Sequence, residues 1–578
     1  MITCSKPISM RKVLIVFVMS CMYLPLFSQQ VEKPIGFSNA LALSPLERYI
    51  VESPDWNELI AHQDDMDRLY GRTIQGRIIA FDITAEEYGV WDILPDGTQV
   101  WRLQLHSDYA MSISAYFSKF FVPDGSSLFI YNNDRTYFEG PIGAEENNEH
   151  GRYVTNDMWG QNITLEYIQP VNVIGQPQLE IRGIGYFFDY VYPPYELSQE
   201  SRGSESCQVN INCPEGLDWQ FQRDAVVRMR ITDGNDIGLC SGAMVNTTAR
   251  DCRQYVLSAL HCAADVSDSD LLYLQFRWNY ERPADENNPF GVCGTAGFSS
   301  ARNRTGAFRL ADSNDISNNG GFQGSDFLLL EVEDDIPDSY SPFFAGWDSR
   351  NLGSPEGVGI HHPAGDIKKI STYNAQTIST FIGAPGSHWQ VRWIETETNH
   401  GTTEGGSSGS PLFNDTRLII GTLSAGLSAC FNGGGMGPNQ PDWYGKMSYH
   451  WSNNPNTSAQ KLREWLDPID LGWDFLYGSY RNGDNNCDPS IGINDLPLSE
   501  YSFSIHPNPS AGELSIRFKG DLMNGKVNVY NAMGQMLHQS VFSGPVLEMD
   551  LSEFRSGAYY VTVQNASGYS KTERWVKL

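Results

Sequence analysis

Three serine hydroxyls lie in one glycine-rich stretch, GTTEGGSSGSPLFN, which spans residues 401–414. A serine hydroxyl is a weak nucleophile, so it needs a base within hydrogen-bond reach and a third group that orients the base. Two upstream stretches supply such groups. QYVLSALHCAA brings His261 to the end of a β-rich run, and GSDFLLLEVE opens an apolar run with Asp326. The chain order His, Asp, Ser therefore predicts catalysis by a serine nucleophile.

The elements around these residues are short, β-rich runs. Between residues 207 and 475 they include VVRMRI, QYVLSAL, LLYLQFRW, DFLLLEV, HWQVRW and RLIIGTLSA, followed by one helix-like stretch, SAQKLREWL. Many strands with a single late helix predict an all-β barrel domain, with the helix packed on the barrel. Cys262, next to His261, can tie the histidine loop to Cys240 through a disulfide.

Regions without cysteine flank the barrel on both sides. From 75 to 195, the runs GRIIAFDI, QVWRLQLHS, SLFIYN, NITLEYI and LEIRGIGYFFDYVY predict a β-sandwich. The polar segment YPPYELSQESRGSES then suits an exposed boundary. After residue 475, a stretch rich in Asn, Asp, Gly and Pro predicts a linker over 476–498, and a small strand-rich module follows.

Length, charge and cysteine use limit the class of protein. The 578 residues predict two to four domains, and the net charge of −29 excludes a nucleic-acid binder, because phosphate contacts need a basic face. Basic residues before the apolar run VLIVFVMSCMYLPLF predict a signal peptide over 1–28, with a start at Met10 or a lipid anchor at Cys21 as alternatives. Of the ten cysteines, Cys4 and Cys21 lie in the predicted signal peptide. The other eight lie between 207 and 487, and an even number in an exported chain predicts disulfides.

The three chemical segments together resemble those of the trypsin-like serine proteases. SALHC resembles the histidine motif, SDFLLLEV the aspartate motif and GSSGSP the serine motif. The resemblance implies that Ser408 is the nucleophile, His261 the base and Asp326 its orienting partner. It also implies an oxyanion hole made by the backbone amides of Gly406 and Ser408. Trypsin has an aspartate before the nucleophile that receives a new N-terminus, whereas this chain has Ser407 there.

The central part resembles the bacterial lysyl endopeptidase branch in particular. The landmarks, in the expected order, are SCQVNINCPEG, CSGAMVNTT, AGWDSR, GIHHPAGDIKKIS, TEGGSSGSPLF and DWYGKMS. The resemblance implies three disulfides: Cys207–Cys430, Cys213–Cys293 and Cys240–Cys262. Cys252 and Cys487 are left over, and they either pair with each other or stay free.

The flanking regions also resemble parts of secreted proteases. Region 29–202 resembles the propeptides of this branch, which assist folding and cover the active site, and a carbohydrate- or partner-binding sandwich is the alternative. HPNPSAGELSI, VNVYNAMGQML and SGAYYVTVQNASGYSKTERWVKL resemble the C-terminal sorting domain of the type IX secretion system. We therefore expect an all-β chain with an N-terminal β-sandwich propeptide at 29–202, a trypsin-like double β-barrel protease domain at 203–475 and a small C-terminal β-sandwich sorting domain at 499–578.

The acid at the base of the specificity pocket determines which side chain such an enzyme accepts before the scissile bond. Trypsin has this acid six residues before the nucleophile, where this chain has Thr402. The lysyl endopeptidase branch has it after the nucleophile strand, where PDWYG offers Asp442, and Glu404 is a weaker alternative at the rim. A buried carboxylate favours a cationic side chain, because leaving the carboxylate unpaired is costly.

Two observations bear on the choice between lysine and arginine. Lysine-restricted members have a histidine where GTLSAG has Ser424, and the sequence shows no clear equivalent of the tryptophan that partners it. No lysine occurs between Lys119 and Lys368, whereas Arg202 directly precedes GSESC, where the mature chain of the family would begin. An enzyme that processes itself must then accept arginine, so we expect cleavage after both Arg and Lys.

The resulting prediction is a secreted serine endopeptidase, made as a zymogen, that acts as a monomer on protein or peptide substrates without a cofactor or metal. Its partner is the type IX secretion machinery, and its location is the medium or the outer-membrane surface of a Gram-negative cell. A catalytically inactive surface adhesin and a glutamyl-specific protease are the alternatives. His361 and His362 lack an accompanying carboxylate or cysteine pattern, which favours a structural loop over a metal site. FNGGGMG lacks the lysine of a phosphate loop and predicts a turn.

Overall fold

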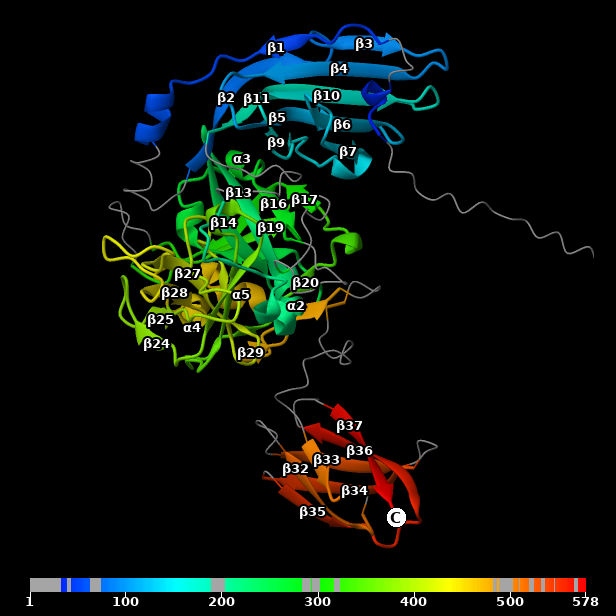
Figure 1. The fold of residues 1–578 in the computed structure, drawn as a ribbon, viewed down its shortest axis with the longest axis vertical. Helices are drawn as coiled ribbons and strands as arrows, with labels where there is room; N and C mark the ends of the chain where they lie inside the picture. The colour runs from blue at the N-terminus through cyan, green and yellow to red at the C-terminus, as the bar shows by residue number, and fades with distance from the viewer. Residues whose placement is uncertain are drawn as a thin grey trace, which may run out of the picture.

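The computed structural model describes residues 33–38, 43–62, 74–188, 203–282, 293, 302–315, 323–481, 486–487, 503–508, 510–518, 524–531, 536–544, 546–565 and 570–578. The predicted signal peptide and Arg202 lie outside the described residues. Three bodies follow one another along the chain, from the blue N-terminal strands to the red C-terminal strands (Figure 1). Strands dominate each body, and none of the helices in the described ranges has the length and apolar character of a membrane span.

The N-terminal body is a sandwich of two β-sheets, as predicted. One sheet contains β1 (Arg48–Ile50), β4 (Gln99–His106), β10 (Asn162–Gln169), β6 (Ser127–Asn132) and β7 (Phe138–Ile142), with β3 (Val90–Ile93) beside β4. The other contains β2 (Ile74–Thr84), β11 (Gln178–Phe187), β5 (Ser112–Phe121), β8 (Tyr153–Val154) and β9 (Met158–Trp159). Alternate residues of facing strands fill its core, among them Trp101, Leu103, Leu105, Ile113, Ala115 and Phe117. This period of two is the one that a half-buried strand requires.

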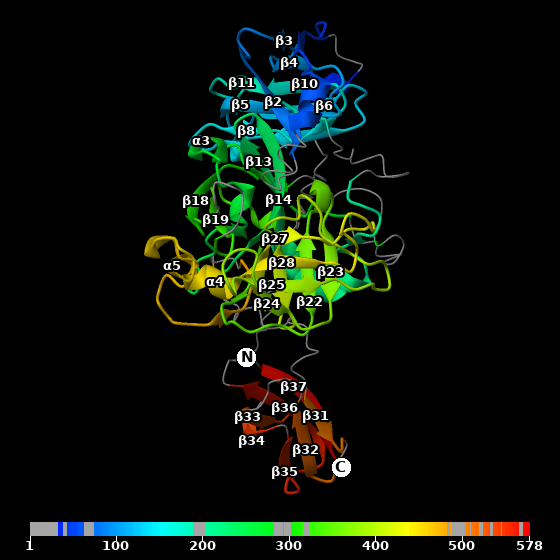
Figure 2. The same cartoon turned by 90° about the vertical axis from the view of Figure 1, so that its left-hand side faces the viewer.

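The central body is built on two further groups of strands, which Figure 2 shows one above the other. The first contains β13 (Val226–Asp233), β14 (Asp236–Met244), β15 (Tyr255–Ser258), β16 (Gln275–Trp278), β17 (Arg302–Thr305), β18 (Ala307–Asp312) and β19 (Leu328–Val332). The second contains β12 (Val209–Asn210), β23 (Lys369–Tyr373), β22 (Gly357–His361), β26 (Pro411–Asn414), β27 (Ile419–Gly426), β28 (Pro441–Lys446), β25 (His388–Arg392) and β24 (Ile378–Thr380). The loops that follow β15, precede β19 and precede β26 hold His261, Asp326 and Ser408.

Short helices and strands complete the central body. They are α2 (Gln220–Ala225), α3 (Asp268–Leu271), α4 (Met447–Ser452), α5 (Leu462–Leu466), β20 (Phe343–Phe344), β21 (Trp347–Asp348), β29 (Phe475–Leu476) and β30 (Ser479–Tyr480). The predicted helix SAQKLREWL is in fact two pieces, a 3-10 turn over Ser458–Gln460 and α5, because Lys461 between them is extended, with ψ 137°. Leu462 and Leu466 of α5 are buried in the core, as the amphipathic spacing predicts.

The predicted boundary at 475 is too early. β29 pairs with β21, β30 pairs with β20, and Cys487 is joined to Cys252 by a disulfide. The sequence-based boundary missed these contacts because the strands are two residues long and lie in a polar, turn-rich stretch. The central body therefore includes the chain up to 481 and the cysteine at 487.

The sandwich extends a sheet of the central body. β2 pairs with β14 at Asp236, Ile237 and Gly238, so hydrogen-bonded strands continue from one body into the other. Ile78 and Tyr116 of the sandwich share a buried apolar cluster with Ile237 of the central body. Strand addition together with apolar burial is the way in which two folded units form a stable joint.

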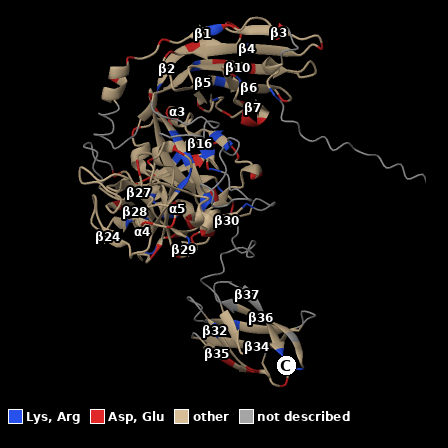
Figure 3. Cartoon of the chain, viewed as in Figure 1, with Lys and Arg blue, Asp and Glu red and all other residues tan. Residues whose placement is uncertain are grey.

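Buried charges reinforce this joint. Residues drawn as Lys and Arg gather around β16, under the sandwich (Figure 3). Burial opposes ionisation of the sandwich residue Asp157, but Arg228, Arg230 and Arg277 of the central body outweigh it and lower the pKa of Asp157. Arg230 lies 3.2 Å from the Asp157 carboxylate, and both side chains are buried. Separation of the two bodies would leave these charges without their partner.

The C-terminal body is a second, smaller sandwich, as predicted. One sheet contains β31 (Phe503–His506), β32 (Glu513–Phe518) and β35 (Val546–Asp550), and the other contains β34 (Met536–Ser543), β33 (Asn524–Tyr530), β36 (Gly557–Asn565) and β37 (Ser570–Lys577). Ile516, Val527, Val561 and Trp575 are fully or almost fully buried in its core. This body therefore has an apolar core of its own.

Candidate active site

His261 and Asp326 form a buried, two-point contact. His261 lies in a 3-10 turn, Leu260–Cys262, directly after β15. The backbone amide of His261 donates to Oδ1 of Asp326 at 2.9 Å, and its ring Nδ1 lies 2.7 Å from Oδ2. Asp326 is fully buried and His261 is 8% exposed. With Nδ1 engaged by the carboxylate, Nε2 is the ring nitrogen that can take the proton of a serine nucleophile.

Strand β14 brings the glycine-rich turn to the histidine loop. The amide of Ser241 donates to the carbonyl of Ser408 at 2.8 Å. The hydroxyl of Ser258, at the end of β15, donates to the carbonyl of Ser241 at 2.8 Å. Gly409 has a φ of 77°, and a Cβ there would lie 2.1 Å from the Ser258 hydroxyl. Only glycine permits this approach, so the residue after Ser408 packs against Ser258 at the end of β15, the strand that leads to His261.

The turn before Ser408 is fixed by a neighbouring loop. Gly406 has a φ of 87°, and a Cβ there would lie 2.9 Å from the amide nitrogen of Gly365. The amide of Ala364 donates to the carbonyl of Gly405 at 2.6 Å. These close contacts fix the backbone whose amides the sequence assigns to the oxyanion hole, at Gly406 and Ser408.

Ser407 occupies the place of the trypsin aspartate, and a buried histidine holds it. Nδ1 of His361 lies 2.8 Å from the Ser407 hydroxyl, and Nε2 lies 3.0 Å from the hydroxyl of Ser371. Burial lowers the pKa of His361 to about 3, so the ring is neutral. The Ser407 hydroxyl also accepts the amide of Glu404 at 3.1 Å. The turn is thus locked by neutral hydrogen bonds instead of an ion pair.

Asp442 is a fully buried carboxylate with several donors. Its Oδ2 accepts Nε1 of Trp393 at 2.5 Å and the hydroxyls of Thr403 and Ser428 at 2.7 and 2.6 Å. Its Oδ1 accepts the amide of Ser428 at 3.0 Å. Burial raises the pKa of Asp442 against the opposing effect of these hydrogen bonds. A Cβ on Gly426 would lie 2.3 Å from Oδ1, so only glycine lets the backbone of β27 pack this closely against the carboxylate.

Comparison with known proteins identifies the central and C-terminal bodies. Residues 202–445 match the family model of the lysyl endopeptidase C-terminal domain, and residues 504–577 match that of the secretion system C-terminal sorting domain. The central body is therefore similar to the C-terminal domain of the lysyl endopeptidases. The sorting domain marks it for secretion or for the outer cell surface.

Individual relatives are distant. A lysyl endopeptidase from Pseudomonas aeruginosa is 25% identical over 364 residues, which cover 60% of this chain and 73% of that protein. A solved Glu endopeptidase is 14% identical and covers 43% of this chain and 93% of its own, with a TM-score of 0.24. A thermostable serine protease from an extremophilic microorganism is 14% identical and covers 41% of this chain and 100% of its own, with a TM-score of 0.26.

Four disulfides cross-link the central body. The structure contains the three pairs that the resemblance implies, Cys207–Cys430, Cys213–Cys293 and Cys240–Cys262. The two leftover cysteines form the fourth pair, Cys252–Cys487. The Cys240–Cys262 bond joins the residue before Ser241 to the residue after His261, so it ties together the two segments that position the site.

Glu404 does not contact Asp442. Its carboxylate accepts the amide of Glu205 at 3.1 Å and the side-chain amide of Gln208 at 2.5 Å. Burial raises its pKa, although these donors oppose the shift. Glu404 thus anchors the segment just after the predicted processing site at Arg202, and Asp442 is the better candidate for the specificity acid.

The partners of Asp442 were missed at the sequence level. Trp393 lies just beyond β25, which pairs with β28 so that Val391 faces Asp442 in the register. Thr403 and Ser428 look like ordinary loop residues in the sequence. The tryptophans of HWQVRW could have indicated a donor, because a tryptophan at the end of a strand that pairs with β28 can donate its ring N–H to Asp442. Ser424, which stands where lysine-restricted members have a histidine, lies next to a histidine from another strand. Its hydroxyl is 3.2 Å from Nε2 of His388.

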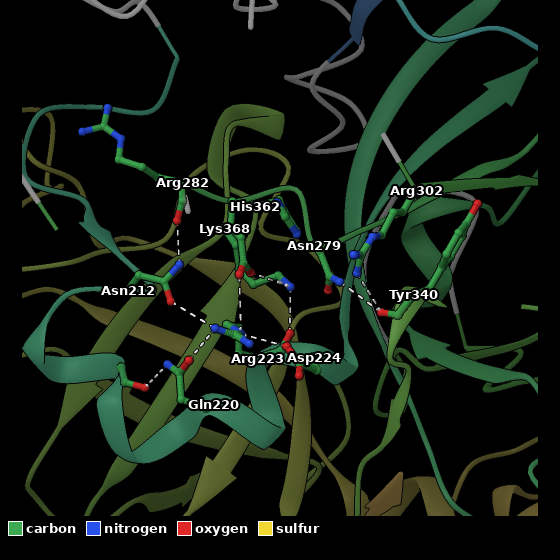
Figure 4. Close-up of polar contacts among 12 residues, drawn as sticks. Asn212, Gln220, Arg223, Asp224, Asn279, Arg282, Arg302, Tyr340, His362 and Lys368 are labelled. Atoms are coloured by element: carbon green, nitrogen blue, oxygen red, sulfur yellow. Dashed lines mark hydrogen bonds and ion pairs between the residues drawn. The ribbon is translucent and has the colours of Figure 1, made fainter. Parts of the chain in front are cut away.

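The landmark GIHHPAGDIKKIS has a structural explanation. Lys368 is fully buried and donates to the carbonyl of Arg223 at 2.7 Å (Figure 4). Arg223 donates to Asn212 at 3.2 Å, and Asn212 donates to the carbonyl of Arg282 at 2.6 Å. Nδ1 of His362 meets a backbone carbonyl at 2.9 Å. In the described ranges, no group of three or more His, Cys, Asp or Glu could hold a metal ion.

Proposed function

We propose that this protein is a secreted serine endopeptidase that cleaves peptide bonds after Arg and Lys. The observation that carries the proposal is the two-point contact of His261 with Asp326, beside a glycine turn that presents Ser408. Ser408 attacks the scissile carbonyl while His261 takes its proton, and Asp326 stabilises the imidazolium. The amides of Gly406 and Ser408 stabilise the oxyanion, and His261 then protonates the leaving amine. Water hydrolyses the acyl-enzyme by the same steps.

Support for basic specificity comes from Asp442. A fully buried carboxylate beside Gly426 favours a substrate cation, because an uncompensated buried charge is costly. A glutamyl-specific enzyme would instead need a cationic or neutral group at that place. The predicted junction after Arg202 adds a requirement for arginine, if the enzyme processes itself.

The N-terminal sandwich is the proposed propeptide. The side-chain amide of Gln75, at the start of β2, donates to the carbonyl of Ala364 at 2.6 Å. Ala364 also bonds the carbonyl of Gly405 in the turn before Ser408. The sandwich therefore reaches a loop that supports the oxyanion amides, as a domain that controls the site until its removal would do.

Replacement of the nucleophile tests the proposal. We expect Ser408→Ala to lower kcat by roughly 10⁶-fold and to abolish labelling by a fluorophosphonate probe. Ser410→Ala is the matched control, because it removes a hydroxyl from the same turn. An inactive adhesin would give no labelling of the wild-type protein. Activity that survives Ser408→Ala, or that is lost in Ser410→Ala instead, would reject the assignment. Matched Arg, Lys and Glu peptides distinguish basic from glutamyl specificity.

A further inference from the structure

Asp326 has an unusual backbone. Its φ is 57°, in the left-handed region that a residue with a side chain rarely adopts. Such a conformation costs on the order of 1–3 kcal/mol, and it persists only where the surroundings fix it. The carboxylate of Asp326 must meet two nitrogens of His261 at once, so a small backbone rotation would break at least one of the contacts.

The segments on either side of Asp326 are clamped. Ser325 donates its amide to Oδ1 of Asn454 at 2.9 Å, and its hydroxyl lies 2.7 Å from Nδ1 of His450. Phe327 donates its amide to the Ser313 hydroxyl at 3.0 Å. These neutral contacts hold the residues before and after the aspartate in place.

The amide of Asp326 itself is held by a second carboxylate. It donates to Oδ2 of Asp315 at 2.9 Å, and Oδ1 of Asp315 accepts the Ser313 hydroxyl at 2.5 Å. Asp315 is 2% exposed. A Cβ on Gly324 would lie 2.5 Å from Oδ2 of Asp315, so the chain approaches this carboxylate closely. The acceptor is a buried carboxylate, although a neutral group could accept the same hydrogen bond.

We propose that Asp315 is a positioning residue for the catalytic pair: it fixes the strained amide of Asp326 and sets the carboxylate of Asp326 against His261. The inference rests on the proposed function of the triad. Asp315 does not touch the reacting atoms and acts only through Asp326. This role is not predictable from the sequence, because Asp315 lies in a polar stretch, LADSNDISNN, that resembles any surface loop.

Asp315 also contributes charge. Burial, and then the neighbouring charge of Asp326, raise the pKa of Asp315 to about 6. Above that pH Asp315 adds a negative charge behind the imidazole, which favours the protonated ring. The histidines near Asp326 stay neutral, since burial lowers the pKa of His388 to about 4 and that of His450 well below its usual value. Arg309 and Asp312 form an ion pair nearby, 3.4 Å apart.

Two substitutions separate the hydrogen bond from the charge. Asp315→Asn can keep an oxygen toward the amide of Asp326 and an NH2 group toward Ser313, so it removes the charge alone. Asp315→Ala removes both. Asp467→Asn is the control, because Asp467 is 4% exposed and accepts the Thr248 hydroxyl at 2.7 Å, as a structural carboxylate of the same domain.

The assay measures kcat and KM against pH for the protein expressed from its full chain and allowed to process, with active sites counted by fluorophosphonate labelling. We expect Asp315→Ala to lower kcat per active site by about 10- to 100-fold with KM unchanged, because misplacement of the base slows the chemical step. We expect Asp315→Asn to keep most of kcat but to move the acid limb of kcat/KM to lower pH. Asp467→Asn should alter neither.

If Asp315→Ala has wild-type kcat per labelled site, or if Asp315→Asn leaves the acid limb in place, Asp315 is only structural. If Asp315→Ala does not fold, the acid limb of Asp315→Asn decides. Failure of the proposed function would be recognised separately, because the Ser408→Ala variant would then be as active as the wild-type protein.

Discussion

The carboxylate of Asp442 accepts more hydrogen bonds than an amide can. Three donors converge on Oδ2, from Trp393, Thr403 and Ser428, and the backbone amide of Ser428 reaches Oδ1. In Asp442→Asn, the amide oxygen must take the place of Oδ2 to satisfy those three donors. The NH2 group then faces the amide of Ser428 at about the 3.0 Å of the native contact, where two donors oppose each other. The substitution therefore removes the negative charge and one hydrogen bond with almost no change in volume.

The expected effect is large for cationic substrates and small for neutral ones. Loss of one partner from a buried ion pair costs about 3–5 kcal/mol, which corresponds to roughly 10²- to 10⁴-fold in kcat/KM. We expect a loss of this size for both Arg and Lys peptides. An uncharged peptide of the same length, with norleucine before the scissile bond, should change little, because it makes no ion pair. Oxyanion stabilisation and the triad are not altered by the substitution.

The assay compares kcat/KM for matched Arg, Lys, norleucine and Glu peptides, with active sites counted by fluorophosphonate labelling. Asp348→Asn is the control, since Asp348 is 3% exposed and pairs with Arg350 at 2.7 Å in the same domain. Wild-type rates on Arg and Lys in Asp442→Asn would show that another group provides specificity. An equal loss on the norleucine peptide would indicate a folding defect. A wild-type preference for Glu would refute the reasoning altogether.

Two further predictions concern the nucleophile turn and the sorting domain. Gly409→Ala should abolish activity while the domain still folds, because its Cβ would lie 2.1 Å from the Ser258 hydroxyl and displace Ser408; Gly386→Ala, with a similar φ of 74° and open space, should stay active. Deletion of 499–578 should leave a folded protease inside the cell envelope, because that body has its own core; fractionation checks this, and normal export would contradict it.

The sequence was informative wherever chemistry and local context coincide. His261, Asp326 and Ser408 each lie in a short motif at a strand end, and the structure brings the histidine and aspartate into contact. The alternation of apolar residues predicted both sandwiches, since a strand repeats every two residues. Such local signals do not depend on knowledge of the partner strand.

The sequence was silent wherever a role depends on a distant segment. Trp393 acts on Asp442 only because β25 pairs with β28, and Asp315 acts on Asp326 only because their loops meet. The contacts of Glu404 with Glu205 could not be foreseen either, because these residues are far apart in the chain. Polar side chains that hold another polar side chain have no pattern of their own, so only the fold reveals them.

Strand β14 contacts the turn around Ser408, the histidine loop and the N-terminal sandwich. Ser241 of β14 donates its amide to the carbonyl of Ser408 and its hydroxyl to the carbonyl of Gly406, and its hydroxyl also accepts the amide of His362. The preceding cysteine is bonded to Cys262, next to the base. The opposite end of β14 is the edge on which the N-terminal sandwich adds its strand β2. The strand that contacts Ser408, Gly406 and the histidine loop is therefore the same strand that pairs with the sandwich, so a change at that edge can alter the proposed active site.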